Sequence, residues 1–460
     1  MRSGYFIAVT AVALMACNRT DRQTVNEPAK KPNILVILSD DAGYHDFGFQ
    51  GSDDLETPNL DRLAANGVIF TDAHVTASVC SPSRAGLITG RYQQRFGHEA
   101  NSPPASLGMD TTETTIADAM KQAGYYTALF GKWHLGNETR YHPNQRGFDH
   151  FYGLLGGARN YFPSDYGAGN PRAMMLNQEF SEFNNGYLTD ALGDSTVSLI
   201  QRIDEQPLFI FLSFTAVHTP MQARQDDLDR FEGHPRQTLA AMTFAMDRAV
   251  GKVIDALDAQ NELENTLIFF LNDNGGSRFN DASNEPLKGH KGTKYEGGIR
   301  VPYFVTWPEK FNGGTTYDGL ASSLDVFATS LAAAGTDQTP GKPLDGVNLI
   351  PYLNGEKSGP PHQQLFFRKE EEAAMREGKW KLIRLEDFGY ALYNLEKDPD
   401  ENLNLADANS GQLEKMKRSL QQWEQELMKP LWHESQDWRE VTYDIHKALM
   451  QNNKPERVRP

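Results

Sequence analysis

The chain has 460 residues, a length typical of two or three domains, and its 45 basic and 61 acidic side chains give a formal net charge of −16. Hydrophobic residues make up 39%, and 39 glycines bring the apolar share into the globular range, which excludes disorder and fibrous repeats as the main organisation. The acidic balance argues against nucleic acid as a partner, and an anionic substrate would need a local cluster of cations.

The N-terminus carries an apolar run from Tyr5 to Ala16 after the basic residue Arg2. This run is too short to span a bilayer and is typical of a secretory signal. It ends Leu14-Met15-Ala16-Cys17, which resembles a bacterial lipobox, so Cys17 would be lipidated and become the mature N-terminus. We predict a signal peptide over 1–17, a tether over 18–31 and an outer-membrane anchor facing the periplasm or the surface. A plainly cleaved signal, giving a periplasmic or secreted protein, is the alternative.

Four apolar runs of strand length each lead into polar residues. The runs are Ile34–Leu38, Tyr126–Phe130, Leu208–Phe214 and Leu267–Leu271, and helical periodicity lies between them at 116–123 and 239–257. This alternation predicts an α/β fold with a large, mostly parallel sheet covered by helices on both faces. Active sites of such sheets lie beyond the carboxyl ends of the strands, where these polar residues fall.

The composition changes after about residue 350, where prolines and glycines mark a loop. Short strand patterns follow at 364–368, 380–385 and 391–394, and an amphipathic helix pattern covers 413–428. We therefore predict a main domain over 32–350 and a small C-terminal α+β subdomain over 351–460.

The second cysteine, Cys80, lies in a polar segment, and its spacing from Cys17 fits neither a disulfide framework nor a zinc site. A free cysteine is usually a buried, inert residue. Here, however, Pro82 is well placed to begin a helix with Arg84 in its first turn, and a helix N-terminus presents unpaired N–H groups to an anion. This position therefore favours chemistry on an oxyanion.

The segment Cys80-x-Pro82-x-Arg84, followed by Thr89-Gly90, is similar to the signature of the type I sulfatases. Further blocks resemble that family in the family's order, and together they span about residues 32 to 305: Ser39-Asp40-Asp41, Gly131–Gly136, Asp273-Asn274-Gly275 and Gly289–Pro302. The chain is similar to enzymes of the arylsulfatase A and N-acetylgalactosamine-6-sulfatase type. The resemblance implies an alkaline-phosphatase-like α/β sandwich and the conversion of Cys80 to Cα-formylglycine by a formylglycine-generating or radical maturase.

Four oxygen-bearing side chains, Asp40, Asp41, Asp273 and Asn274, follow two of the predicted strands. Hard oxygen ligands select Ca²⁺ or Mg²⁺ over Zn²⁺. The family resemblance implies one Ca²⁺ at these four positions. The alternative is that the aspartates cap a helix and that Asp273-Asn274-Gly275 is a turn.

The same resemblance implies roles for the remaining site residues. The hydrate of formylglycine at position 80 would attack sulfur, and its second hydroxyl would allow the release of sulfate. Arg84 would hold the formylglycine, Lys132 and Lys291 would bind sulfate oxygens, and His134 would contact the formylglycine hydroxyl. His218 would protonate the leaving alcohol, and Asp273 could also accept the nucleophile's proton.

Residues after the signature are candidates for contacts with the substrate. Arg95, His98 and Asn101 would read the sugar next to the sulfate, or else be ordinary surface residues. The aromatic loop with Tyr161, Phe162 and Tyr166 would stack on sugars, or else pack on its neighbours.

We therefore predict a sulfuric ester hydrolase acting on a sulfated polysaccharide or oligosaccharide, of the algal galactan or glycosaminoglycan type. One alternative is a phosphonate monoester or phosphodiester hydrolase of the same superfamily. Another is a non-catalytic lipoprotein that binds glycans.

Overall fold

The computed structural model describes residues 1, 4, 30–336 and 341–455. The chain divides into two units, Met1–Lys30 and Lys31–Pro460, and everything below concerns the second. Cys17 and nearly all of the predicted signal peptide and tether lie outside the described residues.

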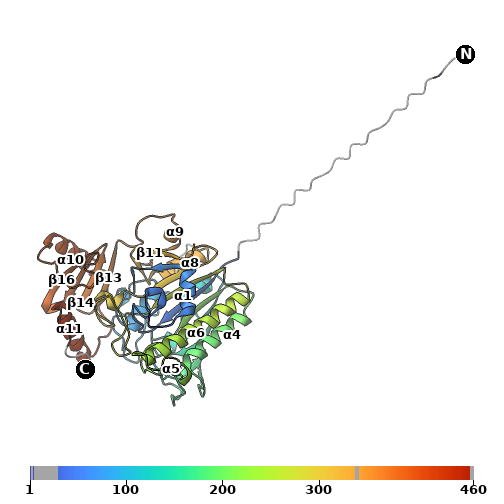
Figure 1. The fold of residues 1–460 in the computed structure, drawn as a ribbon, viewed down its shortest axis with the longest axis horizontal. Helices are drawn as coiled ribbons and strands as arrows, with labels where there is room; N and C mark the ends of the chain where they lie inside the picture. The colour runs from blue at the N-terminus through green and yellow to red at the C-terminus, as the bar shows by residue number, and fades with distance from the viewer. Residues whose placement is uncertain (2–3, 5–29, 337–340, 456–460) are drawn as a thin grey trace. The chain divides into compact units, whose positions relative to one another are not determined.

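A ten-stranded mixed sheet forms the centre of the second unit (Figure 1). Its strands, in order across the sheet, are β11 (Thr315–Tyr317), β2 (Val68–Phe70), β10 (Tyr303–Thr306), β9 (Thr266–Asn272), β1 (Asn33–Ser39), β8 (Leu208–Ser213), β4 (Tyr126–Lys132), β5 (His150–Leu154), β6 (Met174–Leu176) and β7 (Glu179–Ser181). The run from β9 to β5 is parallel, and β10 is antiparallel to β9. A two-stranded ribbon of β3 (Ala73–His74) and β12 (Ala321–Ser322) lies beside it.

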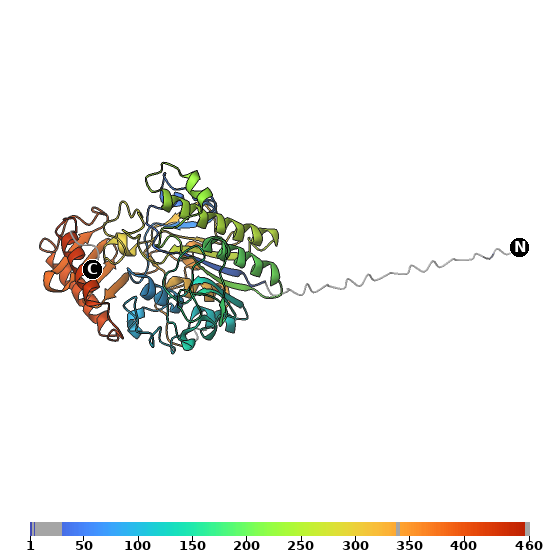
Figure 2. The same cartoon turned by 90° about the horizontal axis from the view of Figure 1, so that it is seen from below.

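Helices cover both faces of this sheet because its central strands are apolar on both sides. In β1, Leu35 and Ile37 pack into one core with α1 (Pro58–Ala65), α4 (Leu188–Arg202) and α6 (Gln237–Ala259). Ile34, Val36 and Leu38 pack into the other core with α2 (Cys80–Thr89), α3 (Ile116–Gln122) and α8 (Asp325–Ala333). Figure 1 shows α4 and α6 side by side, and Figure 2 shows strands between the helical layers.

The remaining helices are short or belong to the C-terminal region. They are α5 (Gln225–Arg230), α7 (Glu296–Ile299), α9 (Ile350–Leu353), α10 (Ser410–Glu424) and α11 (Gln436–Met450), with 3₁₀ turns at Gly48–Gln50, Gln93–Phe96, Thr139–Tyr141, Pro143–Gln145 and Glu386–Phe388. None of the helices in the described ranges is long and apolar enough to cross a membrane.

An antiparallel sheet forms the C-terminal part, drawn in orange and red in Figure 1. Its strands are β13 (Gln364–Lys369), β14 (Glu372–Glu377), β15 (Trp380–Leu385) and β16 (Gly389–Asn394). One face packs against α10 through Met416, Leu420 and Trp423. The opposite face packs against Tyr295 and Ile299 of the main domain.

The predicted fold class is confirmed: a large, mostly parallel sheet lies between helices, and a small α+β unit follows it. All four predicted core strands are present, each within two residues of its expected ends. Two elements that the sequence analysis does not predict, β14 and α11, complete the C-terminal part.

Candidate active site

Cys80 is the first residue of α2, and only 1% of its surface is exposed. The preceding residue, Val79, is extended, and no side chain caps the helix within the described structure. The Lys291 ammonium donates to Cys80 Sγ over 3.1 Å, and Asp40 Oδ1 lies 3.9 Å from the same sulfur. Burial raises the pKa of the thiol to about 12. An unmodified Cys80 is therefore a protonated thiol at neutral pH, and a thiol is a weak nucleophile.

The polar residues around Cys80 come from the carboxyl ends of four adjacent strands. In the order β9, β1, β8, β4, these ends lead to Asp273 and Asn274, to Asp40 and Asp41, to His218, and to Lys132 and His134. Because these parallel strands are neighbours, residues distant in sequence meet at one edge of the sheet. Lys291 reaches the same place from the loop before α7.

Buried carboxylates and cations alternate in this cluster. Lys132 Nζ lies 2.6 Å from Asp40 Oδ2, and Lys291 Nζ lies 2.7 Å from Asp41 Oδ1. Arg84 Nη2 lies 2.8 Å from Asp273 Oδ2. Burial opposes the ionisation of Asp40, but the charges of Lys132, His218 and Arg84 outweigh it and lower the pKa of Asp40. Burial and the adjacent Asp40 charge raise the pKa of Asp273.

The four predicted metal ligands form a compact set of oxygen donors. Asn274 Nδ2 donates to Asp41 Oδ1 over 2.8 Å, and the Asp41 amide lies 3.4 Å from Asp273 Oδ1. Asn274 Oδ1 is buried, and none of the described residues donates a hydrogen bond to it. A buried acceptor without a donor, beside three carboxylates, fits a divalent cation with oxygen ligands. Asp40 and Asp41 also lie with Cys80 and His218 in a group whose ligand atoms are within 4.8 Å of one another.

Two histidines of the site are partly buried. The backbone of His134 is in the left-handed region (φ 62°), and desolvation together with the charges of Lys132 and Arg84 lowers its pKa well below the usual value, so it is neutral. His218 keeps 19% of its side chain exposed, and its Nε2 lies 3.6 Å from Asp41 Oδ2. His218 Nδ1 donates to the carbonyl of Thr219 over 2.6 Å. Its Nε2 is therefore the nitrogen available to a substrate.

Three further residues support this arrangement: the sequence analysis misses Ser213 and Asn280, and it expects Tyr161 to stack on a sugar. Ser213, at the end of β8, accepts from Arg84 Nη1 over 2.6 Å and donates to the Lys132 carbonyl over 2.7 Å. Tyr161 Oη donates to the carbonyls of Thr215 and His218, and Asn280 Nδ2 donates to those of Asp41 and Val217. A polar residue ending an apolar strand is a signal for Ser213, whereas Asn280 lies in a loop whose sequence carries no comparable signal.

Comparisons with known proteins identify the family. The profile of the Sulfatase family matches residues 32–336, and that of the N-sulphoglucosamine sulphohydrolase C-terminal region matches residues 290–429. Human N-acetylgalactosamine-6-sulfatase is 32% identical over 70% of this chain and 66% of its own length. Human arylsulfatase G is 32% identical over 78% of this chain and 75% of its own. The chain belongs to the sulfatase family. This confirms the resemblance, and the sulfatase is a sulfuric ester hydrolase.

A solved structure supports the same conclusion. Ps i-CgsB in complex with k-i-k-neocarrahexaose is 34% identical to this sulfatase, with a TM-score of 0.84 over 92% of this chain and 99% of that chain.

The predicted sugar-reading residues lie in different places. Arg95 is held by Asp345 and Glu426, at 2.8 and 2.9 Å. His98 is fully buried, with Nε2 2.7 Å from Ser81 Oγ, and burial lowers its pKa to about 3. Both therefore support the sulfatase's internal structure. Asn101 accepts from the Ser81 amide over 3.0 Å and also lines the catalytic pocket.

The three aromatic residues of the predicted sugar-stacking loop also lie in different surroundings. Tyr161 is buried against Tyr187 at a ring-centroid distance of 5.5 Å, so its face is not open to a sugar. Phe162 is exposed, and Tyr166 lies under the Arg159 guanidinium.

The catalytic pocket of the sulfatase has a volume of about 320 Å³ and opens from Asp41, His218 and Lys291 toward the C-terminal part. Its far wall contains Lys369 of β13, Glu434, and Trp438 of α11. The C-terminal part therefore takes part in the pocket as well as packing on the main domain.

Proposed function

We propose that this sulfatase removes sulfate esters from a sulfated polysaccharide or oligosaccharide of the algal galactan or glycosaminoglycan type. The observation that carries the proposal is a pocket lined by His218, Lys291 and Trp438, in which the Lys291 ammonium contacts the sulfur of the buried Cys80. The similarity to Ps i-CgsB, whose structure holds a neocarrahexaose, supports a galactan as substrate. Sulfate release from carrageenan and chondroitin sulfate oligosaccharides, measured by ion chromatography, tests it.

The chain's own residues would bind and orient the sulfate group. The ammonium group of Lys291, which lines the pocket, and that of the buried Lys132, which pairs with Asp40, would donate to sulfate oxygens. Arg84, fixed by Asp273 and Ser213, would hold residue 80, and the partly buried His134 would contact its hydroxyl. His218 Nε2, near the pocket opening, is positioned to give a proton to the leaving alcohol.

We also propose that Cys80 is oxidised to formylglycine, which would supply the nucleophile that attacks sulfur. The raised pKa of the thiol supports a need for modification. Peptide mass spectrometry of protein from a host with a working maturase tests it on the tryptic peptide Leu63–Arg84. The expected mass is that of thiol-to-aldehyde conversion. A fully unmodified thiol in active protein would contradict the proposal.

The metal we propose is one Ca²⁺, held by Asp40, Asp41, Asp273 and Asn274. When bound, it would neutralise charge on the sulfuryl oxygens. The all-oxygen donor set supports a hard cation. Chelation with EGTA should abolish activity, and Ca²⁺ should restore it better than Zn²⁺. Full activity in the metal-free protein, checked by elemental analysis, would contradict the assignment.

We propose that Cys17 is lipidated and anchors the enzyme to the outer membrane. The lipobox-like sequence Leu14-Met15-Ala16-Cys17 supports this. Metabolic labelling with a palmitate analogue should mark the wild-type chain and not Cys17→Ala. An unlabelled wild-type chain in the soluble fraction would favour a cleaved signal.

The two alternatives give different results in the same assays. A phosphonate monoester or phosphodiester hydrolase would turn over bis(p-nitrophenyl) phosphate with a higher kcat/KM than p-nitrophenyl sulfate. A glycan-binding lipoprotein would bind the oligosaccharides without releasing sulfate and would contain unmodified Cys80.

A further inference from the structure

The catalytic pocket extends well beyond the sulfate-binding cluster. We call this region the outer pocket and define it by Arg278, Phe279, Lys369, Glu434 and Trp438, which line it together with the catalytic residues. Arg278 and Phe279 lie in the loop after the predicted metal ligands Asp273 and Asn274. Glu434 and Trp438 lie beyond residue 429, where the family match ends.

Both lysines that line the pocket form ion pairs with carboxylates. Lys291 Nζ pairs with Asp41, and Lys369 Nζ lies 3.1 Å from Glu434 Oε2. His290 is neutral, because burial lowers its pKa to about 4. Arg278 is exposed and forms no hydrogen bond or ion pair with any residue in the described ranges. In a chain with a net charge of −16, a free guanidinium in the catalytic pocket is available to an anionic group of a ligand.

Trp438 provides the apolar part of the outer pocket. It lies in the first turn of α11, and 40% of its surface is exposed. Its backbone contacts Ser435 and Thr442, but its indole makes no ring contact with the rest of the described structure. A rigid, partly exposed indole is suited to pack against the apolar face of a sugar ring.

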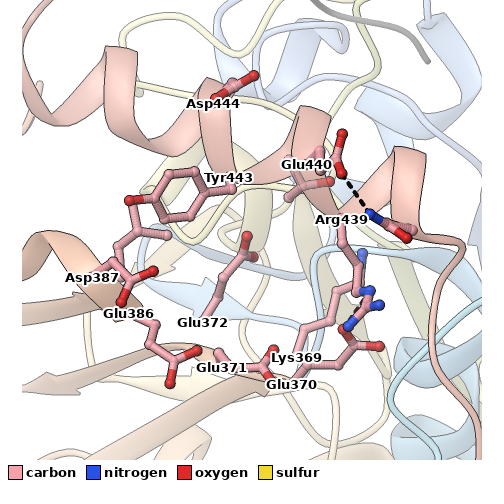
Figure 3. Close-up of a pocket in the computed structure, with 13 residues that line it drawn as sticks. Lys369, Glu370, Glu371, Glu372, Glu386, Asp387, Arg439, Glu440, Tyr443 and Asp444 are labelled. Carbon is pink, nitrogen blue, oxygen red and sulfur yellow. Dashed lines mark hydrogen bonds and ion pairs between the residues drawn. The ribbon is translucent and has the colours of Figure 1, made fainter.

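A second cavity across α11 restricts where an anionic glycan can lie. It shares Lys369 and Thr442 with the catalytic pocket, but seven carboxylate side chains line it against the two cations Lys369 and Arg439 (Figure 3). Such a concentration of negative charge repels a sulfated chain. The glycan is therefore favoured on the Arg278 side of the outer pocket.

We propose that the outer pocket is a subsite for a second anionic group on the same glycan. This group is a sulfate ester or a carboxylate, and it lies on the sugar next to the one that carries the sulfate ester being hydrolysed. Arg278 binds this group, and Trp438 packs against its sugar ring. This inference rests on the proposed function and deepens it, because it makes the enzyme selective for densely charged glycans.

The test measures inhibition of p-nitrophenyl sulfate hydrolysis by tetrasaccharides of ι-carrageenan and of the less sulfated κ-carrageenan. Arg278→Ala should raise the inhibition constant of the ι tetrasaccharide about tenfold more than that of the κ tetrasaccharide, which is the effect of one charge-assisted hydrogen bond. Arg278→Lys should recover part of the loss. Arg418→Ala, an exposed arginine of α10 that does not line the pocket, is the matched control and should change neither constant.

Trp438→Ala should weaken the binding of both carrageenan tetrasaccharides to the same degree, and Trp438→Phe should restore it. A chondroitin sulfate tetrasaccharide tests the carboxylate as the source of the second charge: stronger loss with it than with the ι tetrasaccharide would assign the subsite to uronic acids.

Two results would overturn the subsite. One is an equal effect of Arg278→Ala on both carrageenan tetrasaccharides, and the other is no effect on either. Failure of the proposed function looks different, because the wild-type enzyme would then hydrolyse p-nitrophenyl sulfate and be inhibited by none of the glycans. That outcome rejects the substrate class together with the subsite.

Discussion

His218 is oriented by hydrogen bonds on both sides of its backbone turn. Its Nδ1 donates to the Thr219 carbonyl, and Tyr161 Oη donates to the His218 carbonyl over 2.8 Å. Burial lowers the pKa of His218, although Asp41 opposes this effect. A lower pKa makes the imidazolium a stronger acid, which suits proton donation to an alcohol leaving group.

We expect His218→Ala to lower kcat for sulfated oligosaccharides by about 10²- to 10⁴-fold, the usual contribution of a general acid. The loss should be much smaller for p-nitrophenyl sulfate, since nitrophenolate leaves without a proton. Initial rates on both substrates check this, with the exposed His433→Ala as control. Equal losses on both substrates would rule out proton donation by His218.

The local sequence motifs predict most of the residues around Cys80 but not the surroundings of the residues farther from it. Asp40, Lys132 and Asp273 each lie within a short motif that directly ends a strand, so the sequence is enough to place them. Arg95 also lies close to the signature, yet its partners Asp345 and Glu426 are 250 and 331 residues away in the chain. Pairing over such distances follows from the tertiary fold, which the local sequence does not reveal.

The N-terminus of α8 joins the main domain to the C-terminal part. Asp325, its first residue, accepts from the amides of Ser322 and Val347, both over 2.8 Å. His362, just before β13, lies 2.7 Å from the same carboxylate. Burial opposes the charge on His362, but Asp325 outweighs it and raises the pKa of His362.

A histidine with a raised pKa stabilises the fold fully below its unfolded pKa of about 6.5, and that stability is lost as the pH rises through the folded pKa. We therefore expect His362→Gln to lower the melting temperature most at pH 5.5, with the difference from wild type shrinking toward pH 9. Calorimetry across this range checks the prediction. A difference that is constant with pH would show that His362 acts only through neutral hydrogen bonding.

Element types were easier to predict in the main domain than in the C-terminal part. The strands β1, β8 and β9 are continuous apolar runs, and no other element type suits such short runs between helices. In contrast, β14 has the sequence Glu-Ala-Ala-Met-Arg-Glu, whose residues favour a helix. It becomes a strand because β13 and β15 pair with it on both sides.

At the scale of the whole molecule, a buried charge network links the main domain to the C-terminal sheet. Lys381 Nζ lies 2.8 Å from both Glu296 Oε1 and Glu401 Oε1, and all three side chains are fully buried. Arg376 joins the network through Glu296 and Asp72. Glu296 begins α7, five residues after Lys291, so the network also supports the loop that carries this lysine.

Replacing Lys381 with methionine would leave the buried Glu401 carboxylate without its cation, whereas Glu296 would keep Arg376. We expect Lys381→Met to reduce the free energy of unfolding by about 3–5 kcal/mol, measured by urea denaturation. Lys379→Ala, which removes an exposed pair with Glu396, should change it by less than about 0.5 kcal/mol. The double variant Lys381→Met/Glu401→Gln should recover part of the loss, and a single variant as stable as wild type would contradict the prediction.

The depth of Cys80 has a consequence for how the enzyme is made. In the folded chain its sulfur lies 3.1 Å from the Lys291 ammonium, and 1% of the residue is exposed. A modifying enzyme needs the backbone on both sides of its target, and here that backbone is the first turn of a buried helix. The proposed oxidation of Cys80 would therefore have to precede folding. Slowing the maturase relative to translation should yield a stable, correctly folded and permanently inactive protein.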